Sequence, residues 1–461
     1  MTDSRKRSRN FGAVVLAAGM GTRMKSRTPK PLHQICGRPM MLLVTDAVRN
    51  AGIEDIALVV PPDDKPFRDA LDDTAQYATQ SEPLGTGHAL LQAQYAMRGA
   101  DNVLALYGDV PLIRASTLAA LMQQHIDSDA VVTLITSQVA NPKGMGRIVR
   151  DDNGSIRAIV EERDVDRETR AISEVNSGFY CFRADWLWDN LANLTPAPNG
   201  ELLLTDIIHA ARAQGLHVAS TTPSVSNGES SSSANDPHEM MGVNDRTQLA
   251  QAEVAMRRRI NDRLMLDGVT MPDAASVYID YGVSIGQDTT VLPNTHIKGE
   301  TVIGIGCTIG PSAIIENATI GDDCEILSSV VRDSTLAAGV DVGPFSHIRG
   351  GARIGSSVHI GTSAEVKNSR IGRGTKMGHF SYMGDATLGE NVNIGAGAIT
   401  CNFDGKSKHE TVIGRNAFIG SDTMLVAPVN IGDGASTGAG AVVTKDVPGN
   451  ALVVGVPARE L

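Results

Sequence analysis

The second half of the sequence carries an aliphatic residue that returns about every sixth position and is usually followed by glycine. The pattern runs from Ile285 to Val443. Examples are Ile303-Gly304, Ile309-Gly310, Val342-Gly343, Ile354-Gly355, Ile360-Gly361, Ile394-Gly395, Ile413-Gly414, Ile419-Gly420 and Ile431-Gly432. A helix repeats every 3.6 residues and a flat strand every 2, so neither explains the spacing. The repeat predicts a β-helix of hexapeptides, with three short strands in each turn.

This pattern also predicts how such a domain is held together. The aliphatic side chains point inward and stack from turn to turn, so a column of Ile, Val and Leu forms the core. Glycine follows because the chain bends sharply at each corner, where a side chain is hard to accommodate. The resulting prism has flat faces along which a ligand can lie, but the periodicity alone does not say which ligand.

Composition excludes several classes of protein. With 461 residues, the chain is too long for one core, and its two dissimilar halves indicate two domains. The net charge of −11 argues against a general binder of nucleic acid or anionic membranes. No apolar run reaches the roughly 18 residues of a membrane span, and the short run Phe11–Ala18 passes into a glycine-rich turn instead of a signal-peptide cleavage site. We therefore expect a cytoplasmic protein with no stable membrane association.

The five cysteines support neither a disulfide framework nor a zinc site. They are scattered, odd in number and without any Cys-x-x-Cys pair. We expect reduced, buried thiols at all five positions, which are Cys36, Cys181, Cys307, Cys324 and Cys401.

The first half alternates continuous apolar runs with amphipathic stretches. Strands buried on both faces of a doubly wound α/β (Rossmann-like) domain have this appearance. The predicted strands are Ala13–Ala17, Ile56–Val60, Val103–Leu106, Ala130–Ile135 and Gly178–Phe182, with helices at Met40–Asn50 and His88–Met97.

Changes in composition suggest the domain boundaries. We expect a first domain over residues 1–244, a linker helix over 245–268 and the β-helix domain over 269–461. The serine-rich stretch 222–237 buries almost nothing, which predicts a disordered surface insertion. Residues 400–411 interrupt the hexapeptide rhythm, and loops thrown out of a solenoid usually serve a binding face.

A glycine-rich turn follows the first predicted strand. Its small residues let backbone N–H groups approach phosphates, and two cations, Arg23 and Lys30, can neutralise a pyrophosphate. The glycines alone fit an ordinary strand-to-helix turn equally well, and it is the basic pair that favours phosphate binding. The turn matches neither the Walker sequence nor the dinucleotide fingerprint. The expected nucleotide-binding residues in and just before this turn are Leu16, Ala17, Ala18, Gly19 and Gly21.

Leu-Ala-Ala-Gly-x-Gly-Thr-Arg-Met followed by Pro-Lys resembles the signature of sugar-1-phosphate nucleotidyltransferases. Further matching segments follow in chain order, and six ordered motifs are hard to obtain by chance. They are Gln80 with 84–89, 107–112, 146–148, 160–162, 174–178 and 242–244.

The resemblance implies a role for each matching residue. Gln80, Gly85 and Thr86 face the base, and Tyr107, Gly108 and Asp109 form the metal-binding segment. Asp109 and Asn244 hold Mg²⁺, while Gly146, Glu161 and Asn176 contact the sugar. Arg23 and Lys30 stabilise charge on the phosphates during the reaction. Taken alone, Gly108-Asp109 would be interpreted as a turn, and the sugar contacts could be structural polar residues.

Polar residues interrupt the hexapeptide repeats over neighbouring turns. Arg349 and Lys367 suit a phosphate, and Tyr382 and Asn393 suit phosphate or sugar groups. His379 is the candidate catalytic base, because an imidazole can take a proton from an amine at neutral pH. A lone histidine is usually structural, as we expect for His296, His347 and His359, and only the neighbours of His379 single it out.

This constellation resembles the acetyltransferase half of the bifunctional N-acetylglucosamine-1-phosphate uridyltransferase/glucosamine-1-phosphate acetyltransferase family, and the match covers essentially the full chain. The resemblance implies a left-handed parallel β-helix, a homotrimer with the acetyl site between neighbouring prisms, and acetyl-CoA lying along the turns. The coenzyme-contact positions that match are Ala396, Asn402, Phe403, Ser421 and Ala439. Asp385 sits where a family carboxylate could orient the imidazole.

Two positions depart from the family pattern. The segment 455–459 lacks a basic residue before Val456-Pro457, so either Arg459 replaces the usual coenzyme-contacting arginine or that contact is absent. Phe403 stands where tyrosine is common, which keeps the aromatic face and removes the hydroxyl.

The sequence thus predicts a two-site enzyme that makes UDP-N-acetylglucosamine, a precursor of peptidoglycan and lipopolysaccharide. Acetyl-CoA and glucosamine 1-phosphate react in the second half, and UTP and N-acetylglucosamine 1-phosphate react in the first. A one-site nucleotidyltransferase with a structural solenoid is the enzymatic alternative, but it does not explain Lys367, His379, Tyr382 and Asn393 together. A non-catalytic regulatory subunit would be expected to have lost Asp109 or Lys30.

Overall fold

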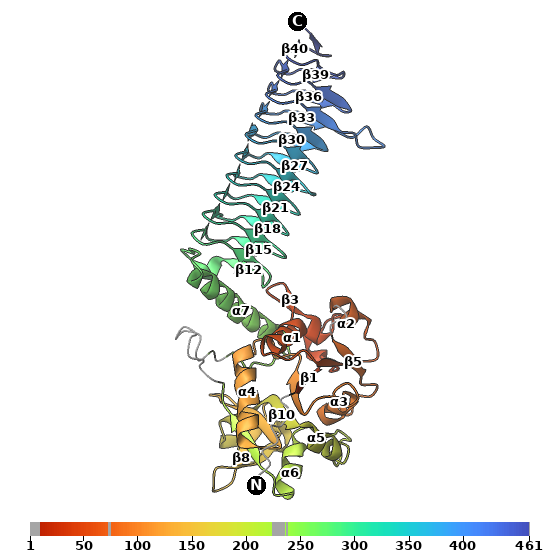
Figure 1. The fold of residues 1–461 in the computed structure, drawn as a ribbon, viewed down its shortest axis with the longest axis vertical. Helices are drawn as coiled ribbons and strands as arrows, with labels where there is room; N and C mark the ends of the chain where they lie inside the picture. Colours follow the sequence, from red (N-terminus) through yellow and green to blue (C-terminus); the bar gives the residue numbers. More distant parts are fainter. Residues whose placement is uncertain (1–9, 72–74, 224–235, 237, 461) are drawn as a thin grey trace, which may run out of the picture. The chain divides into compact units, whose positions relative to one another are not determined.

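The computed structural model describes residues 10–71, 75–223, 236 and 238–460. The chain divides into two compact units, Met1–Met256 and Arg257–Leu461 (Figure 1). The serine-rich insertion lies largely outside the described residues. The predicted functional domains, residues 1–244 and 269–461, stay predictions. The stretch predicted as a linker helix holds helix α7 (Arg246–Leu266).

The first unit is built on a nine-stranded sheet. Its main path has the order β11-β7-β10-β6-β1-β4-β5, and the hairpin β8–β9 is attached to β10. Neighbours along the path are parallel, except that β10 runs antiparallel to β6 and β7. The strands are β1 (Phe11–Leu16), β4 (Ile56–Val60), β5 (Gln76–Thr79), β6 (Asn102–Tyr107), β7 (Val132–Gln138), β8 (Arg147–Arg150), β9 (Ile156–Val160), β10 (Glu174–Arg183) and β11 (Val218–Thr221). A separate small hairpin joins β2 (Gln34–Ile35) and β3 (Arg38–Pro39).

Two apolar layers cover the faces of this sheet. Val14 belongs to one layer and its neighbour Val15 to the other, as expected for side chains that alternate along a strand. The helices are α1 (Met40–Asn50), α2 (Lys65–Ala70), α3 (Thr86–Gln92), α4 (Ala115–Ser128), α5 (Ala184–Leu191) and α6 (Asp206–Ala213). Helices α3, α5 and α6 contribute to the first layer, and α1 and α4 to the second. The doubly wound α/β prediction is therefore confirmed, with one antiparallel strand added.

The predicted elements of this unit are present with shifted ends. Helix α1 has the predicted bounds, whereas the helix predicted from His88 to Met97 begins at Thr86 and ends at Gln92. Beyond Gln92 the chain continues as turns closed by i→i+3 hydrogen bonds, such as that from Ala93 N–H to the Leu90 carbonyl at 3.0 Å. Strand β10 begins four residues before the predicted Gly178, since its first residues are largely polar and lack an apolar run.

The second unit is a three-sided prism of stacked turns (Figure 1). The first sheet contains β12 (Tyr278–Ile279), β15 (His296–Lys298), β18 (Ile314–Glu316), β21 (Val330–Arg332), β24 (His347–Arg349), β27 (Glu365–Lys367), β30 (Tyr382–Gly384), β33 (Ile399–Cys401), β36 (Met424–Val426) and β39 (Val442–Val443). The second contains β13 (Ser284–Ile285), β16 (Val302–Ile303), β19 (Thr319–Ile320), β22 (Thr335–Leu336), β25 (Arg353–Ile354), β28 (Arg370–Ile371), β31 (Ala386–Leu388), β34 (Thr411–Ile413) and β37 (Val429–Ile431). The third contains β14 (Thr290–Val291), β17 (Thr308–Ile309), β20 (Glu325–Ile326), β23 (Asp341–Val342), β26 (His359–Thr362), β29 (Lys376–His379), β32 (Asn393–Ile394), β35 (Phe418–Ile419), β38 (Ser436–Thr437), β40 (Leu452–Val454) and β41 (Arg459–Glu460).

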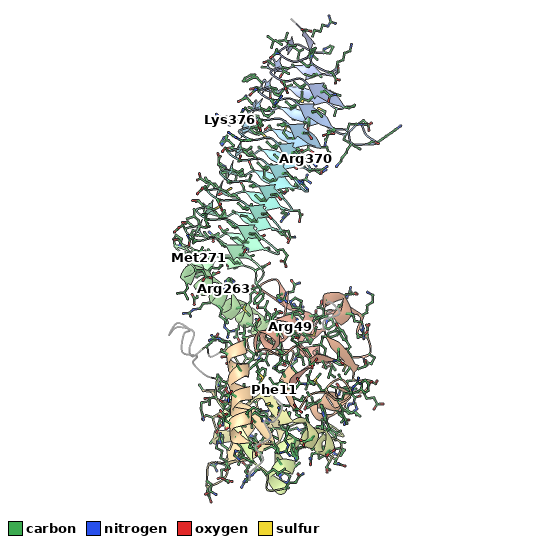
Figure 2. The ribbon with its side chains drawn as sticks, viewed as in Figure 1. Phe11, Arg49, Arg263, Met271, Arg370 and Lys376 are labelled. Carbon is green, nitrogen blue, oxygen red and sulfur yellow. The ribbon has the colours of Figure 1, made fainter. Side chains whose placement is uncertain are left out.

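The hexapeptide residues form the core of this prism as predicted. The strands of each sheet pair in parallel with strands one turn away, except that the last strand, β41, runs antiparallel to β40. Ile303 lies against Ile320, for example, and both are almost completely buried. Glycine is required at the corners, because a β-carbon on Gly361 would lie 2.1 Å from the carbonyl oxygen of Gly378. Polar side chains such as Arg370 and Lys376 lie on the outside (Figure 2). The predicted left-handed parallel β-helix is thereby confirmed.

Helix α7 reaches the first turns of the prism through its last residues. The amide of Asn261, which is buried, donates to the carbonyls of Ala274 and Val277 at 2.8 and 3.1 Å. The guanidinium of Arg257 lies 4.4 Å from the ring centre of Tyr278. The first turn of the prism has no preceding turn to pack against. These contacts place α7 over that end of the aliphatic column.

The prediction of free thiols is confirmed at all five cysteines, and the prediction of burial is confirmed at four. All five thiols are free; four are buried and Cys401 is half-buried. Among the described residues, no helix is both long enough and apolar enough to span a membrane.

Buried His125 makes the stability of the first unit sensitive to acid. Its Nδ1 lies 2.9 Å from the hydroxyl of Thr133. Burial, together with the charge of Arg183, lowers the pKa of His125 to about 4 from its ordinary value of 6.5. The unfolded chain therefore binds a proton at a higher pH than the folded chain does. The stabilisation is complete above pH 6.5 and is lost as the pH falls towards 4.

We predict that His125→Gln removes most of this pH dependence. Between pH 7.5 and 5.0 the wild-type free energy of unfolding should fall by about 2 kcal/mol more than that of the variant. Urea unfolding followed by tryptophan fluorescence measures this difference, since both tryptophans, Trp186 and Trp188, lie in the first unit. Equal pH dependence in the two proteins would contradict the assignment.

Candidate active sites

The glycine-rich turn follows the end of β1 and packs closely against the side chain of Lys30. Gly21 has a left-handed backbone conformation, with φ of 56°. A β-carbon at this position would lie 2.5 Å from the β-carbon of Lys30, so only glycine lets the lysine pass so closely. The turn continues into the short 3₁₀ segments η1 (Thr22–Met24) and η2 (Lys30–Leu32), which carry the two predicted cations.

Lys30 brings the two predicted metal ligands together. Its ammonium forms an ion pair with the carboxylate of Asp109 and donates to Oδ1 of Asn244 at 3.1 Å. The same amide oxygen accepts a hydrogen bond from Arg23 at 2.9 Å. Asp109 and Asn244 are 135 residues apart in sequence, yet their oxygens converge on one cationic nitrogen.

This donor set fits a hard divalent cation. Carboxylate and amide oxygens are the ligands that Mg²⁺ prefers, and here both already face a positive charge, that of Lys30. Among the described residues, no group of three or more His, Cys, Asp or Glu side chains could hold a metal. A bound Mg²⁺ would therefore need oxygens from substrate phosphates and water, which is its usual mode of binding in phosphoryl-transfer sites.

A cavity of about 310 Å³ opens next to this cluster. Ten of the predicted nucleotide-contacting residues line it, namely Leu16, Ala17, Ala18, Gly19, Lys30, Gln80, Gly85, Thr86, Tyr107 and Asp109. The amide of Gln80 donates to the Gly85 carbonyl at 3.1 Å, which fixes it at the cavity wall. Burial raises the pKa of Tyr107, so its hydroxyl stays protonated near neutral pH.

Sequence reasoning missed the segment that supports the loop predicted to contact the base. Leu202 N–H donates to the Leu84 carbonyl and Gly87 N–H donates to the Leu202 carbonyl, both at 2.8 Å. Gly85 has φ of 98°, and a β-carbon there would lie 2.5 Å from the Leu202 carbonyl oxygen. The neighbouring Glu201 lines the cavity. No local motif marks Glu201 or Leu202, because their role arises from pairing with a loop about 115 residues earlier in the chain.

The predicted sugar contacts also lie together. A β-carbon on Gly146 would lie 3.7 Å from both Oε2 of Glu161 and the β-carbon of Asn176. Burial raises the pKa of Glu161, whose Oε1 accepts a hydrogen bond from Thr205 at 3.0 Å. The segments carrying Gly146 and Glu161 are tied by an ion pair between buried Arg147 and Glu162 at 2.8 Å.

In the prism, three of the four predicted acceptor-binding residues, Arg349, Lys367 and Tyr382, lie on successive turns of the first sheet. Arg349 and Lys367 are direct neighbours in register, and Glu365 lies beside Tyr382. Arg349 also pairs with Glu365 at 2.6 Å, a partner that sequence reasoning did not foresee. The stacking of turns thus gathers residues about 17 positions apart onto one patch.

His379 ends a strand of the third sheet, one corner before Tyr382. Its imidazole is exposed and forms no hydrogen bond or ion pair within the part of the chain that the structure describes. Two other prism histidines have partners, since His296 stacks on Tyr278 with ring centres 4.5 Å apart and His359 contacts Asp341 at 2.5 Å. His347 has an unpartnered Nε2 but, unlike His379, it is half-buried. Asn393 follows on the next turn of the third sheet, paired with Lys376.

The loop that leaves the prism between β33 and β34 adds to this patch (Figure 1). Asn402 donates to Asp385 at 2.6 Å and lies 3.5 Å from the hydroxyl of Tyr382. Asp385 accepts a second amide hydrogen bond from Asn368 at 2.6 Å, so both of its oxygens hold amides, and no contact with the imidazole of His379 is seen among the described residues. The expected orienting role of Asp385 therefore has no geometric support.

Lys408 is a further residue that sequence reasoning missed. It lies on the same loop, and contact with the ammonium of Lys367 lowers its pKa. Two like charges side by side repel each other unless an anion joins them, so this pair favours phosphate binding. Lysines in loops are common, and only the folded loop reveals the pairing.

The predicted coenzyme contacts form a column of small residues. Asp422 N–H donates to the Ala396 carbonyl and Gly440 N–H to the Ser421 carbonyl, at 2.7 and 2.8 Å, which stacks residues 396, 421 and 439 over three turns. Phe403 is exposed on the extruded loop. Arg459 lies opposite Val454, which packs on Gly438, one residue before Ala439.

Comparison with known proteins agrees with this architecture. Residues 12–225 match the nucleotidyl transferase family, and residues 410–445 match the bacterial transferase hexapeptide (six repeats) family. The fold and sites thus define a nucleotidyltransferase unit joined to a hexapeptide-type transferase unit.

Curated relatives align along nearly the whole chain. Proteins named "Bifunctional protein GlmU" share 46% identity over 444 residues in Heliobacterium modesticaldum, 45% over 445 in Geobacillus sp. (strain WCH70) and 44% over 450 in Geotalea uraniireducens. Each alignment covers 96% of this chain and 94 to 96% of the relative. The chain belongs to the bifunctional GlmU family.

The crowding at Gly178 gives a test of the sugar-site geometry. Gly178 and Gly154 have φ of 79° and 78°, but a β-carbon on Gly178 would lie 2.4 Å from the ring of Tyr107, whereas one on Gly154 would meet open space. Gly178→Ala should lower the free energy of unfolding by about 2 to 4 kcal/mol, and Gly154→Ala by about 1 kcal/mol. Urea unfolding measures both, and equal losses would contradict the packing described.

Proposed function

We propose that this chain is a two-site enzyme that makes UDP-N-acetylglucosamine. The prism transfers acetyl from acetyl-CoA to glucosamine 1-phosphate, and the first unit transfers uridylyl from UTP to the N-acetylglucosamine 1-phosphate formed. One observation carries the proposal: the Lys30–Asp109–Asn244 cluster beside a nucleotide-sized cavity occurs in the same chain as the Arg349–Lys367–Tyr382 patch. Full-length similarity to bifunctional relatives supports it.

In the first unit, a phosphate oxygen of N-acetylglucosamine 1-phosphate attacks the α-phosphorus of UTP. A new P–O bond forms in line with the bond that breaks, and pyrophosphate leaves. The protein supplies position and charge more than covalent chemistry. Lys30 and Arg23 neutralise the phosphates, and the backbone around Gly19 and Gly21 lets them approach closely. Gln80, Gly85 and Thr86 hold the uracil.

Mg²⁺ is the cofactor proposed for this step. Asp109 and Asn244 would hold it, which their convergence on the Lys30 ammonium supports. When bound, the ion neutralises charge on the triphosphate and on the leaving pyrophosphate. Gly146, Glu161 and Asn176 are proposed to contact the sugar, and their closeness to one another supports this role.

In the prism, the amine of glucosamine 1-phosphate attacks the thioester carbonyl of acetyl-CoA. The C–N bond forms, the C–S bond breaks and coenzyme A leaves as its thiolate. His379 takes the proton that the amine loses, and its exposed imidazole without protein partners supports this role. Arg349, Lys367, Lys408, Tyr382 and Asn393 are proposed to bind the sugar phosphate.

The coenzyme is proposed to lie along the column formed by Ala396, Ser421 and Ala439, where small side chains leave room. Asn402, Phe403 and Arg459 would complete its site. We propose a homotrimer that works in the cytoplasm, with the acetyl site between neighbouring prisms. The hexapeptide prism, a common oligomerising fold, supports the trimer.

A one-site nucleotidyltransferase with a structural prism remains the competing function. It leaves the Lys367–Lys408 pair without an anion and the exposed His379 without a role. A non-catalytic subunit would have no need for the convergent Lys30, Asp109 and Asn244.

Two substitutions should separate the activities. We expect His379→Ala to abolish acetyl-CoA consumption, by about 100-fold or more, while UTP turnover stays near normal. Asp109→Ala should do the reverse. Free thiol and pyrophosphate are measured separately in each variant. Loss of both activities in either folded variant would contradict independent sites.

The placement of Asn244 should depend on Glu239 and not on the insertion that precedes it. Buried Glu239 accepts hydrogen bonds from Arg114 N–H at 3.1 Å and the Thr117 hydroxyl at 2.6 Å, and Val243 N–H donates to the Asp109 carbonyl at 2.8 Å. These bonds fix the segment 239–243 that leads to Asn244.

We predict that deleting residues 224–234 changes both activities less than twofold. Glu239→Ala should instead lower pyrophosphate release about tenfold and raise the Mg²⁺ concentration needed for half-maximal rate. Glu239→Gln, which keeps an acceptor oxygen, is the matched control and should retain most of the activity. A large loss on deletion, or none in Glu239→Ala, would contradict this account.

A further inference from the structure

Both ends of the Asn176 amide are held by the protein. Its Oδ1 accepts a hydrogen bond from Gly178 N–H at 3.1 Å, and its Nδ2 donates to the hydroxyl of Tyr180 at 2.6 Å. The two bonds are compatible with only one orientation of the amide. If the amide were rotated by 180°, the Nδ2 donor would face the N–H donor of Gly178. One N–H and one lone pair of the amide remain for a ligand.

An irregularity in β10 makes this arrangement possible. The register between β10 and β7 shifts between Asn176 and Tyr180, so the regular ladder is broken there. Gly178, in the middle, has φ of 79°, and the ring of Tyr107 occupies the space that a side chain would fill. Such bulges re-aim side chains. Here the bulge sets the Asn176 amide against the hydroxyl of Tyr180, four residues later on the same strand.

Tyr180 itself is immobilised and stays protonated. It is fully buried, and its ring stacks on Phe182 with centres 5.6 Å apart. Burial raises the pKa of Tyr180 well above its ordinary value, and the nearby groups of Tyr107 and Glu161 raise it further. The hydroxyl therefore lies close to two residues proposed for the substrate site without lining the cavity itself.

We propose that Tyr180 is a positioning residue for sugar-phosphate recognition, which fixes through its hydroxyl the face that the Asn176 amide presents to the sugar. This inference rests on the proposed uridylyl transfer and deepens it. Sequence patterns gave no indication of Tyr180, since a tyrosine in an apolar strand is expected to be a core residue.

Loss of the Tyr180 hydroxyl should affect the binding of only one of the two substrates. Without the hydroxyl, one N–H of the half-buried Asn176 amide loses its partner, and the amide is held only by Gly178. Binding of the sugar phosphate should weaken, because each binding event must then fix the orientation of the Asn176 amide. Binding of UTP should not change, because its predicted contacts, Gln80, Gly85 and Thr86, lie on other segments.

The test is Tyr180→Phe, which removes one oxygen and keeps the ring. In the full-length protein, KM for N-acetylglucosamine 1-phosphate should rise about five- to tenfold, while KM for UTP and the rate of acetyl transfer change less than twofold. Tyr77→Phe is the matched control, since it makes the same chemical change on edge strand β5 of the same sheet, and it should leave all three values unchanged.

A double-substitution cycle asks whether Tyr180 acts through Asn176. Asn176→Ala alone should raise KM for the sugar phosphate at least as much as Tyr180→Phe does. Adding Tyr180→Phe to Asn176→Ala should then cost less than twofold more, since the residue to be positioned is gone. Full additivity of the two effects would overturn the proposal.

Other outcomes are equally decisive. An unchanged KM for the sugar phosphate in Tyr180→Phe would overturn the positioning role. Equal rises in KM for both substrates, with a lower melting temperature, would show a merely structural role and also overturn it. Failure of the proposed function looks different, because wild-type protein would then release no pyrophosphate from UTP and N-acetylglucosamine 1-phosphate.

Discussion

Parallel strands held in register decide where functional residues meet in both units. In the first unit, Leu16 at the end of β1 pairs with Tyr107 at the end of β6. The glycine-rich turn and Asp109 therefore leave the sheet at one edge, as ligand-binding loops do in open parallel sheets. In the prism, the same kind of pairing sets Arg349 beside Lys367 and Glu365 beside Tyr382. Residues far apart in sequence become neighbours because parallel pairing sets the end of one strand beside the end of the next.

Local charge explains how an acidic protein can serve anionic substrates. The chain carries a net charge of −11, yet each of the two candidate sites contains a pair of cations. Arg23 and Lys30 both donate to the amide oxygen of Asn244 beside the cavity of the first unit, and Lys367 and Lys408 lie together on the prism. Like charges placed together cost stability, and a phosphate between them would relieve that cost. A phosphorylated substrate of the proposed class would therefore stabilise these pairs of cations.

Much of the fold could be predicted from the sequence, because the spacing of apolar residues along the chain indicates the secondary structure. The aliphatic-glycine repeat predicted the prism, and buried apolar runs predicted the central strands. What could not be predicted depends on tertiary contact. Leu202 hydrogen-bonds the loop 84–87, Lys408 contacts Lys367 and Glu365 pairs with Arg349, and none of these contacts has a local signature in the sequence. Asp385 is a different case, because its position suggested a partner for His379, whereas in the folded loop its oxygens accept hydrogen bonds from Asn368 and Asn402.

The central claim is that one chain links two reactions through a shared intermediate. The most direct measurement supplies wild-type protein with glucosamine 1-phosphate, acetyl-CoA, UTP and Mg²⁺, and follows free thiol and pyrophosphate together in time. Thiol should appear first, pyrophosphate should follow after a lag, and the two should reach equal amounts. Pyrophosphate release that needs no acetyl-CoA, or the appearance of only one of the two products, would contradict the account.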